Sequence, residues 1–251
     1  MSIDSNLSAR LAEELEGKGP IYDILVEMDP AAAETYVELS QASRENGKLS
    51  AKERALIHVA VCASVCDLKA DHTRHWIAAA LRLGASKEEI NEVLELTSVL
   101  GIHGLIPGVQ IMVEKAGGLE AFKAQQSAGR QEAAREAATL FQELRGISVS
   151  PVWEANCYAC PELVKAYARY SSVPWQTSAL SPKLKEFVYI AIDLSPSHLE
   201  IGGARAHIDK VQRDYGATDD EIFEIFKLLA LLGYQTQILA LPILKEELCK
   251  L

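Results

Sequence analysis

The stretch from Leu49 to Gly101 decides the fold, because most of it occurs twice in the chain. It reads LSAKERALIHVAVCASVCDLKADHTRHWIAAALRLGASKEEINEVLELTSVLG. A second copy runs from Leu180 to Gly233 and reads LSPKLKEFVYIAIDLSPSHLEIGGARAHIDKVQRDYGATDDEIFEIFKLLALLG. The copies align 131 residues apart at their start and 132 residues apart after one inserted residue. This period exceeds the roughly 20 to 50 residues of solenoid repeats, so we interpret it as a duplicated domain.

The duplication predicts two similar domains. We place the first at residues 1–128, with the N-terminal helices, and the second at residues 129–251, with a linker helix. The lead-in to each copy also matches, since Pro30 falls opposite Pro161. With 251 residues in the chain, each half is long enough to bury its own core.

The copies carry signals for helix starts and none for strands. Ser50 and Glu53 have the spacing of a capping box, and Ser86–Glu89 and Thr218–Glu221 repeat this device at equivalent positions. The β-branched residues are spread at helical rather than alternating spacing. The sequence therefore predicts an all-α fold, with one helix running from Ser50 through Val65.

Composition limits the partners and the compartment. The formal net charge of −10 and the pI near 5.2 argue against a nucleic-acid partner, because such binding depends on Lys and Arg neutralising phosphates. The first residues lack the basic and apolar regions of a secretory signal, so we expect a cytoplasmic protein. Five cysteines in such a chain are expected to be reduced.

Two long uncharged stretches, Leu96–Val113 and Leu228–Leu244, lie at equivalent positions. Both contain Gly, Pro or Gln and border the length of about 20 residues that spans a bilayer. We interpret them as helices buried all round, in the core or in an oligomer interface, and expect no membrane.

The strongest candidate for chemistry lies in the second copy. Glu186, Tyr189 and Asp193 share one helical stripe, which faces a helix that carries His207. The neighbours of Glu186 are apolar, so its carboxylate is expected to be partly buried. A buried glutamate with a histidine partner suits general acid/base work. The alternative is a structural pair at a helix crossing.

The first copy differs at the equivalent positions. His72, His75 and Trp76 share a helix face, but Ala55 stands where the second copy has Glu186. The two halves are therefore not chemically equivalent. We expect His72 and His75 to line a complementary site.

Cysteines provide a competing hypothesis. Cys62 and Cys66 form a CxxxC that is expected to lie on one helix face, and Cys157 and Cys160 form a CxxC with Pro161 next to it. A thiol at the start of a helix has a lowered pKa, which suits redox chemistry. Cys160 also aligns with an ordinary helix-capping residue, Asp29, so a structural role stays open. Nothing in the spacing predicts a metal site or a cofactor.

These features together resemble the carboxymuconolactone decarboxylase family, which shares its fold with AhpD-type alkylhydroperoxidases. The repeated LSxKxxxxxxxA, the histidine before an Ala-rich helix ending in Gly-Ala-Ser or Gly-Ala-Thr, and EEIxEVLxLxxxLG carry the resemblance. The peroxidase branch uses a glutamate followed by CxxC, where this chain has residues 198–201. The decarboxylase branch places its histidine in an Arg-x-His-Ile context, which Arg205 to Ile208 resemble.

The resemblance implies an AhpD-like helical bundle that forms a covalent pseudo-dimer, with three chains rebuilding a six-unit ring. It also implies a small-molecule substrate. Our first hypothesis is a cofactor-independent enzyme that acts on a small organic acid or lactone by proton transfer, with Glu186 and His207 as catalytic residues. The second is a thiol-dependent peroxidase or disulfide reductase, which would use Cys66 with Cys62, or Cys157 with Cys160. The third is a non-catalytic ligand-binding oligomer.

Overall fold

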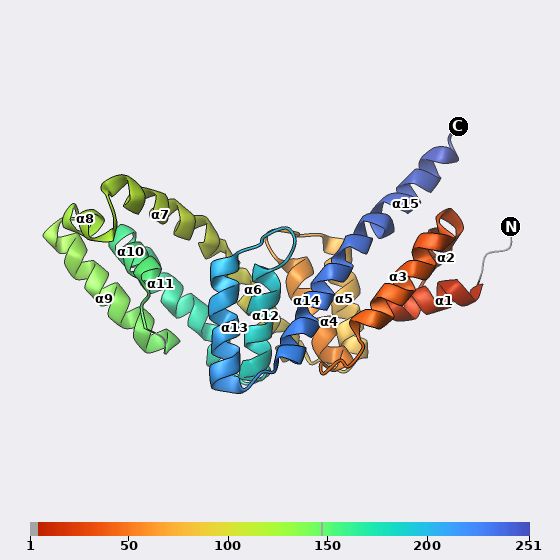
Figure 1. Cartoon of the computed structure of the whole chain (residues 1–251), viewed down its shortest axis with the longest axis horizontal. Helices are drawn as coiled ribbons and strands as arrows, with labels where there is room; N and C mark the ends of the chain where they lie inside the picture. The colour runs from red at the N-terminus through yellow and green to blue at the C-terminus, as the bar shows by residue number, and fades with distance from the viewer. Residues whose placement is uncertain (1–4, 147) are drawn as a thin grey trace. The chain divides into compact units, whose positions relative to one another are not determined.

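The chain is all-α, as predicted. The computed structural model describes residues 5–146 and 148–251, and no strand occurs among them. The elements are labelled in Figure 1. In chain order they are α1 (Ser5–Glu14), α2 (Ile21–Met28), α3 (Pro30–Ser43), α4 (Ala51–Ala63), α5 (Ala70–Arg82), α6 (Lys87–Ser98), η1 (Val99–Gly104), α7 (Leu105–Ala116), α8 (Leu119–Ala124), α9 (Ala128–Arg145), α10 (Pro151–Ala159), α11 (Pro161–Ser172), η2 (Val173–Trp175), α12 (Pro182–Asp193), α13 (Ile201–Tyr215), α14 (Asp219–Ala230), η3 (Leu231–Tyr234) and α15 (Gln235–Leu248).

The contacts group these elements into two compact units. The first unit comprises Met1–Val93 and Lys183–Leu251, and the second comprises Leu94–Pro182. The first unit thus contains the central helices of both sequence copies. Contact units and sequence repeats group the chain differently, so the domain boundary at residues 128 and 129 stays a prediction about the repeat.

The first unit combines contacts between helices that are close in the sequence with contacts between helices that are far apart. α1 packs against α3, α4 against α5, and α2 against α15. Leu11, Leu25 and Val37 are fully buried where the N-terminal helices meet. The rings of Tyr36 and Tyr234 stack with their centroids 3.9 Å apart, which joins α3 to η3. The N-terminal helices are therefore part of the same core as the end of the second copy.

The second unit repeats this arrangement with equivalent helices. α9 packs against α10 and α11, and α7 packs against α8 and α10. Its two clusters of buried residues are centred on Phe141 and on Phe122. The helix that follows each copy, α7 or α15, packs against a helix that precedes the other copy, α10 or α2. This exchange explains why the contact units cut across the repeats.

The helix starts predicted from the sequence are confirmed. The Asp29 side chain accepts a hydrogen bond from the Ala32 amide at 2.9 Å, with Pro30 at the first helical position. Ser50 and Thr218 each form a complete capping box with the glutamate three residues later. One prediction is wrong in detail, because α4 ends at Ala63 rather than Val65.

Two ion pairs, each with a buried carboxylate, tie the copies together at equivalent positions. The Arg54 guanidinium of α4 lies 3.5 Å from the Glu224 carboxylate of α14. The Lys185 ammonium of α12 lies 3.0 Å from the Glu92 carboxylate of α6, with the two side chains only 2% and 3% exposed. Glu224 also accepts hydrogen bonds from the amides of residues 48 and 49, at 2.6 and 2.9 Å. Each copy thus contributes the cation of one ion pair and the anion of the other ion pair.

The two uncharged stretches belong to helical segments Lys87–Ala116 and Asp219–Leu248, which are long and apolar enough to cross a membrane by length and composition alone. Each is divided by a 3-10 turn, η1 or η3. The expectation of helices buried all round within the chain is wrong for α15, none of whose residues is buried. Ile238 and Leu241 pack against the core of the first unit, whereas Leu239 and Ile243 are exposed and available to a partner. Burial of α15 in an oligomer stays a prediction.

Candidate functional site

The close approach of α12 and α13 positions the candidate residues of the second copy. Glu200 caps α13 by accepting hydrogen bonds from the Gly202 and Gly203 amides at 3.0 and 3.3 Å. At Gly203, an added Cβ atom would lie 2.4 Å from Asp193 Oδ2. Glycine is therefore required for the two helices to meet here. One turn later, α13 presents His207 to α12.

Glu186 and His207 form a direct pair, as the sequence predicted. His207 Nδ1 lies 2.6 Å from Glu186 Oε2, and the Glu186 side chain is only 1% exposed. If the carboxylate accepts from Nδ1–H, it holds the imidazole in the tautomer whose Nε2 carries the lone pair. The His207 side chain is 23% exposed, so the ring is reachable from outside. This is the geometry of a histidine base oriented by a buried carboxylate.

Two more side chains complete the surroundings of the pair. The Tyr189 ring lies 4.5 Å from the His207 ring, centroid to centroid, and limits its rotation. Lys210 Nζ lies 3.7 Å from Glu186 Oε1 and donates to Asp214 at 3.1 Å. Burial lowers the pKa of Lys210, but its hydrogen bonds and the nearby carboxylates outweigh this effect and raise the pKa overall. Lys210 therefore stays cationic and offsets the Glu186 charge.

Asp193 lies two turns after Glu186 on the same face of α12. Burial raises the pKa of Asp193 to about 7, an effect that the His207 charge opposes and the Glu200 charge reinforces. The side chain is only 2% exposed. The second copy thus contains an aspartate that changes protonation near neutral pH.

The first copy has a cavity of about 240 Å³ in place of this pair. The His58 ring, equivalent to Tyr189, stacks on Trp76 with centroids 3.9 Å apart. Burial, together with the nearby charges of His75 and Arg54, lowers the pKa of His58 to about 3. Ala55 lines the cavity where the second copy has Glu186. His58 is therefore a neutral ring at physiological pH.

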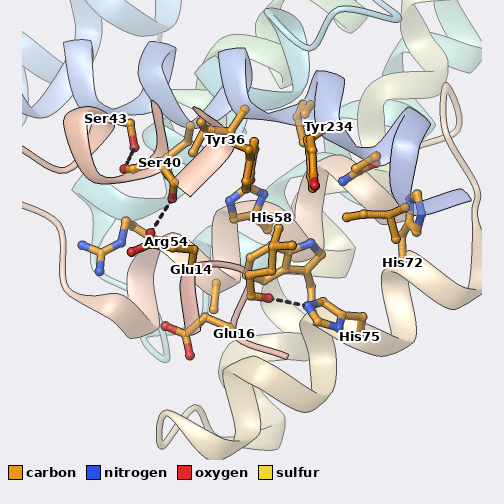
Figure 2. Close-up of a pocket in the computed structure, with 18 of the residues that line it drawn as sticks. Glu14, Glu16, Tyr36, Ser40, Ser43, Arg54, His58, His72, His75 and Tyr234 are labelled. Carbon is orange, nitrogen blue, oxygen red and sulfur yellow. Dashed lines mark hydrogen bonds between the residues drawn. The ribbon is translucent and has the colours of Figure 1, made fainter. Parts of the chain in front are cut away.

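The other two histidines of this copy also line the cavity, as predicted (Figure 2). His75 Nε2 lies 2.7 Å from the Leu15 carbonyl oxygen, which accepts a hydrogen bond from it. Burial lowers the pKa of His75, and the hydrogen bond to Leu15 opposes that effect. His72 Nδ1 is buried without a hydrogen-bond partner. His72 and His75 thus lie in one cavity, without a glutamate that orients either of them.

The sequence did not predict the other walls of the cavity. Glu14, Tyr36 and Tyr234 come from α1, α3 and η3, and they line the cavity together with the predicted histidines. The Ser40 hydroxyl donates to Glu14 Oε2 at 2.7 Å, and Arg44 forms an ion pair with the same carboxylate. No local motif identifies these residues, because only the packing of the N-terminal helices on η3 brings them here.

The cysteines are free thiols. Burial raises the pKa of Cys62 to about 11 and that of Cys157 to about 11. Cys66 lies beyond the end of α4, so the expectation that it shares a helix face with Cys62 is wrong; its Sγ lies 3.6 Å from His198 Nδ1. Burial raises the pKa of Cys66 as well. Cys160 is the N-cap residue of α11 but makes no side-chain capping bond.

One group in the first unit has the composition of a metal site. The ligand atoms of Cys62, Asp67 and His72 lie within 4.8 Å of one another. Lys69 Nζ already pairs with the Asp67 carboxylate at 3.2 Å, and Gln235 Nε2 donates to Cys62 Sγ at 3.7 Å. Burial raises the pKa of Cys62 to about 11, although the hydrogen bond from Gln235 lowers it, so the group holds a protonated thiol and a carboxylate already paired with Lys69 rather than two metal ligands. We assign no metal to this group.

The fold and the paired acid/base groups define a class: an all-α protein with the AhpD-like fold and a buried carboxylate that orients a histidine. The model of the carboxymuconolactone decarboxylase family matches residues 30–101. A crystal structure from Burkholderia xenovorans LB400, provisionally described as a gamma-carboxymuconolactone decarboxylase subunit, is similar over the whole chain. It is 35% identical, with a TM-score of 0.88, and the match covers 98% of this chain and 97% of that one. The chain therefore belongs to the carboxymuconolactone decarboxylase family. No curated protein matches it.

Proposed function

We propose that the protein is a carboxymuconolactone decarboxylase-like enzyme that acts on a small organic acid or lactone by cofactor-independent proton transfer. The observation that carries this proposal is the 2.6 Å contact between Glu186 and His207, with the glutamate buried and the histidine reachable. Membership of the family supports the reaction class.

The chemistry assigns one task to each residue. Loss of CO₂ from a lactone acid leaves an electron pair that must be delocalised and then protonated at carbon. His207 Nε2 would deliver or accept that proton. Glu186 would hold the ring in the required tautomer and stabilise the imidazolium that forms when Nε2 takes up a proton. Lys210 would keep the buried carboxylate electrostatically balanced.

The thiol-peroxidase alternative finds less support. Its nucleophile is a thiolate, whereas burial raises the pKa of Cys62, Cys66 and Cys157. It stays a prediction that a thiol count after mild peroxide treatment would test, as does the hypothesis of a non-catalytic ligand-binding oligomer.

The test of the acid/base proposal is a decarboxylation assay with γ-carboxymuconolactone and related lactone acids. Glu186→Gln and His207→Asn should each lower kcat by about 10²- to 10⁴-fold, the usual contribution of a positioned acid or base. His75→Asn is the matched control, since it changes the equivalent histidine of the first copy and should have a much smaller effect. Full turnover in Glu186→Gln would show that the pair is only structural.

We also propose that three chains assemble into a homotrimer. α15 supports this, because Leu239, Ile243, Leu244 and Leu248 are 47% to 53% exposed on it. Light scattering should then give three times the 27.4 kDa mass of one chain. A single-chain mass at micromolar concentration would contradict the proposal.

A further inference from the structure

The cavity of the first copy has features that the proposed function does not use. It lies within the first unit, and its lining comes from the N-terminal helices, from α4 and α5, and from the segment around η3. The catalytic pair Glu186 and His207 is not part of its lining. We therefore ask which molecule this cavity would bind.

The volume admits a single ring. An engineered cavity of about 150 Å³ lined by apolar side chains binds benzene, so about 240 Å³ accommodates a six-membered ring with a substituent. Flat or apolar side chains form much of the wall, among them Tyr36, Trp76, Leu228, Leu232 and Ile238. Such walls favour a planar, largely apolar ligand.

Two residues of the lining each have a buried polar atom that lacks a hydrogen-bond partner. These atoms are the Tyr234 hydroxyl and His72 Nδ1. Tyr234 is only 8% exposed, and its ring is held by stacking on Tyr36. Figure 2 shows Tyr234, His58 and His72 around the same space. Because buried polar groups are normally hydrogen-bonded, these two atoms point to a ligand with a donor and an acceptor.

The charges of the lining point to a neutral ligand. The Arg44 guanidinium is paired with Glu14, and Arg54 donates to the Leu49 carbonyl at 2.6 Å and lies near Glu224. His58 is neutral, since burial lowers its pKa to about 3. The third cation of the lining, Lys18, is exposed, so no unpaired buried cation of the described lining is available to a carboxylate. A hydroxyl group both donates and accepts hydrogen bonds, so it matches the unpartnered Tyr234 hydroxyl and His72 Nδ1.

We propose that this cavity is a second binding site, distinct from Glu186 and His207, for a small neutral phenol whose hydroxyl lies between Tyr234 and His72. This goes beyond the proposed function, because it involves other residues and an uncharged ligand class. The ring would pack among the aromatic side chains of the lining.

Calorimetric titration of the full-length protein with phenol, toluene and benzoate tests the proposal. Phenol should bind about tenfold more tightly than toluene, which lacks the hydroxyl, and benzoate should bind more weakly than either. Tyr234→Phe removes one hydroxyl and keeps the ring, so it should weaken the binding of phenol about tenfold and leave the affinity for toluene unchanged. Tyr170→Phe is the matched control, because it removes a tyrosine hydroxyl in the second unit. It should change neither the affinity for phenol nor that for toluene.

Further variants separate this site from the catalytic proposal. Leu232→Trp should fill the cavity and abolish phenol binding, and thermal melting would check that it folds. Glu186→Gln should bind phenol like the wild type, so a failed decarboxylation assay does not affect this test. Equal affinity for phenol and toluene, stronger binding of benzoate, or no binding of phenol would each overturn the proposal.

Discussion

The two copies share one histidine and place different side chains at three further equivalent positions of a matched helical frame. Where the first copy has Ala55, His58, Cys62 and His75, the second has Glu186, Tyr189, Asp193 and His207. The second set forms a buried acid/base pair, whereas the first set leaves a cavity with a neutral histidine. One change, from alanine to glutamate, determines whether the shared histidine has a carboxylate partner.

The comparison teaches that a duplicated fold can divide its tasks between copies. His75 and His207 occupy equivalent positions, but His75 contacts the Leu15 carbonyl of α1 and His207 contacts a carboxylate. The partner, rather than the histidine itself, decides what each ring can do with a proton.

The two ion pairs should respond unequally to the same kind of substitution. Lys185→Met leaves the Glu92 charge buried and should lower the free energy of unfolding by about 3–5 kcal/mol. Arg54→Met should cost clearly less, because Glu224 keeps its hydrogen bonds from two backbone amides and Arg54 is 22% exposed. Urea denaturation measures both. Equal losses would show that the two pairs are energetically equivalent.

The copies should also have opposite pH dependences of stability. His58 has a folded-state pKa of about 3 against an ordinary 6.5, so only the unfolded chain takes up its proton in between, and stability is lost as pH falls through this window. Asp193 has a folded-state pKa of about 7 against 3.8, so the folded chain holds the proton, and stability is lost as pH rises from 3.8 to 7.

Variants separate these two contributions. His58→Phe should gain stability relative to wild type as pH falls from 6.5 to 4.5, and Asp193→Asn should gain as pH rises from 4.5 to 7. Each effect should be on the order of a few kcal/mol. Urea denaturation at several pH values provides the measurement. If the difference in unfolding free energy from wild type changed with pH in the same direction for both variants, the shifted pKa values of His58 and Asp193 would be contradicted.

The helix contact at Gly203 should be specific to the second copy. An added Cβ atom there would meet the buried Asp193 carboxylate at 2.4 Å, so Gly203→Ala should destabilise the protein by about 1–3 kcal/mol. Gly129→Ala is the control, since nothing lies within 4 Å of its added atom and alanine favours a helix by about 0.5–1 kcal/mol. If Gly203→Ala were as stable as the control, the contact between α12 and α13 would be looser than described.

The smallest expected effect concerns a device that the copies share. Ser86 and Thr218 cap α6 and α14 at equivalent positions, with the backbone amide three residues later donating at 3.0 and 3.3 Å. Ser86→Ala and Thr218→Ala should each cost about 1 kcal/mol of unfolding free energy. Thermal denaturation compares them. A difference well above this size would show that one helix start carries more of the stability than the other.

Much of the second-copy site could be predicted from the sequence, because it depends on local geometry. Glu186, Tyr189 and Asp193 recur at helical spacing on α12, and His207 lies one turn beyond Gly203 on the next helix along the chain. Two consecutive helices that pack against each other bring such residues together. The cavity of the first copy was predicted only as far as His72 and His75, and its other walls come from α1, α3 and η3.

Local signals in the sequence were sufficient to predict the all-α fold, the duplication, the helix starts and the pairing of Glu186 with His207. These features depend on capping, periodicity and neighbouring helices, which act over short distances along the chain. Only the tertiary structure decided that α7 and α15 pack against helices preceding the other copy, that Arg54 pairs with Glu224, and that Tyr234 lines a cavity with His72. Such contacts join segments that are not neighbours along the chain, 170 positions apart for Arg54 and Glu224. They are selected by the burial of whole helix faces rather than by a local motif.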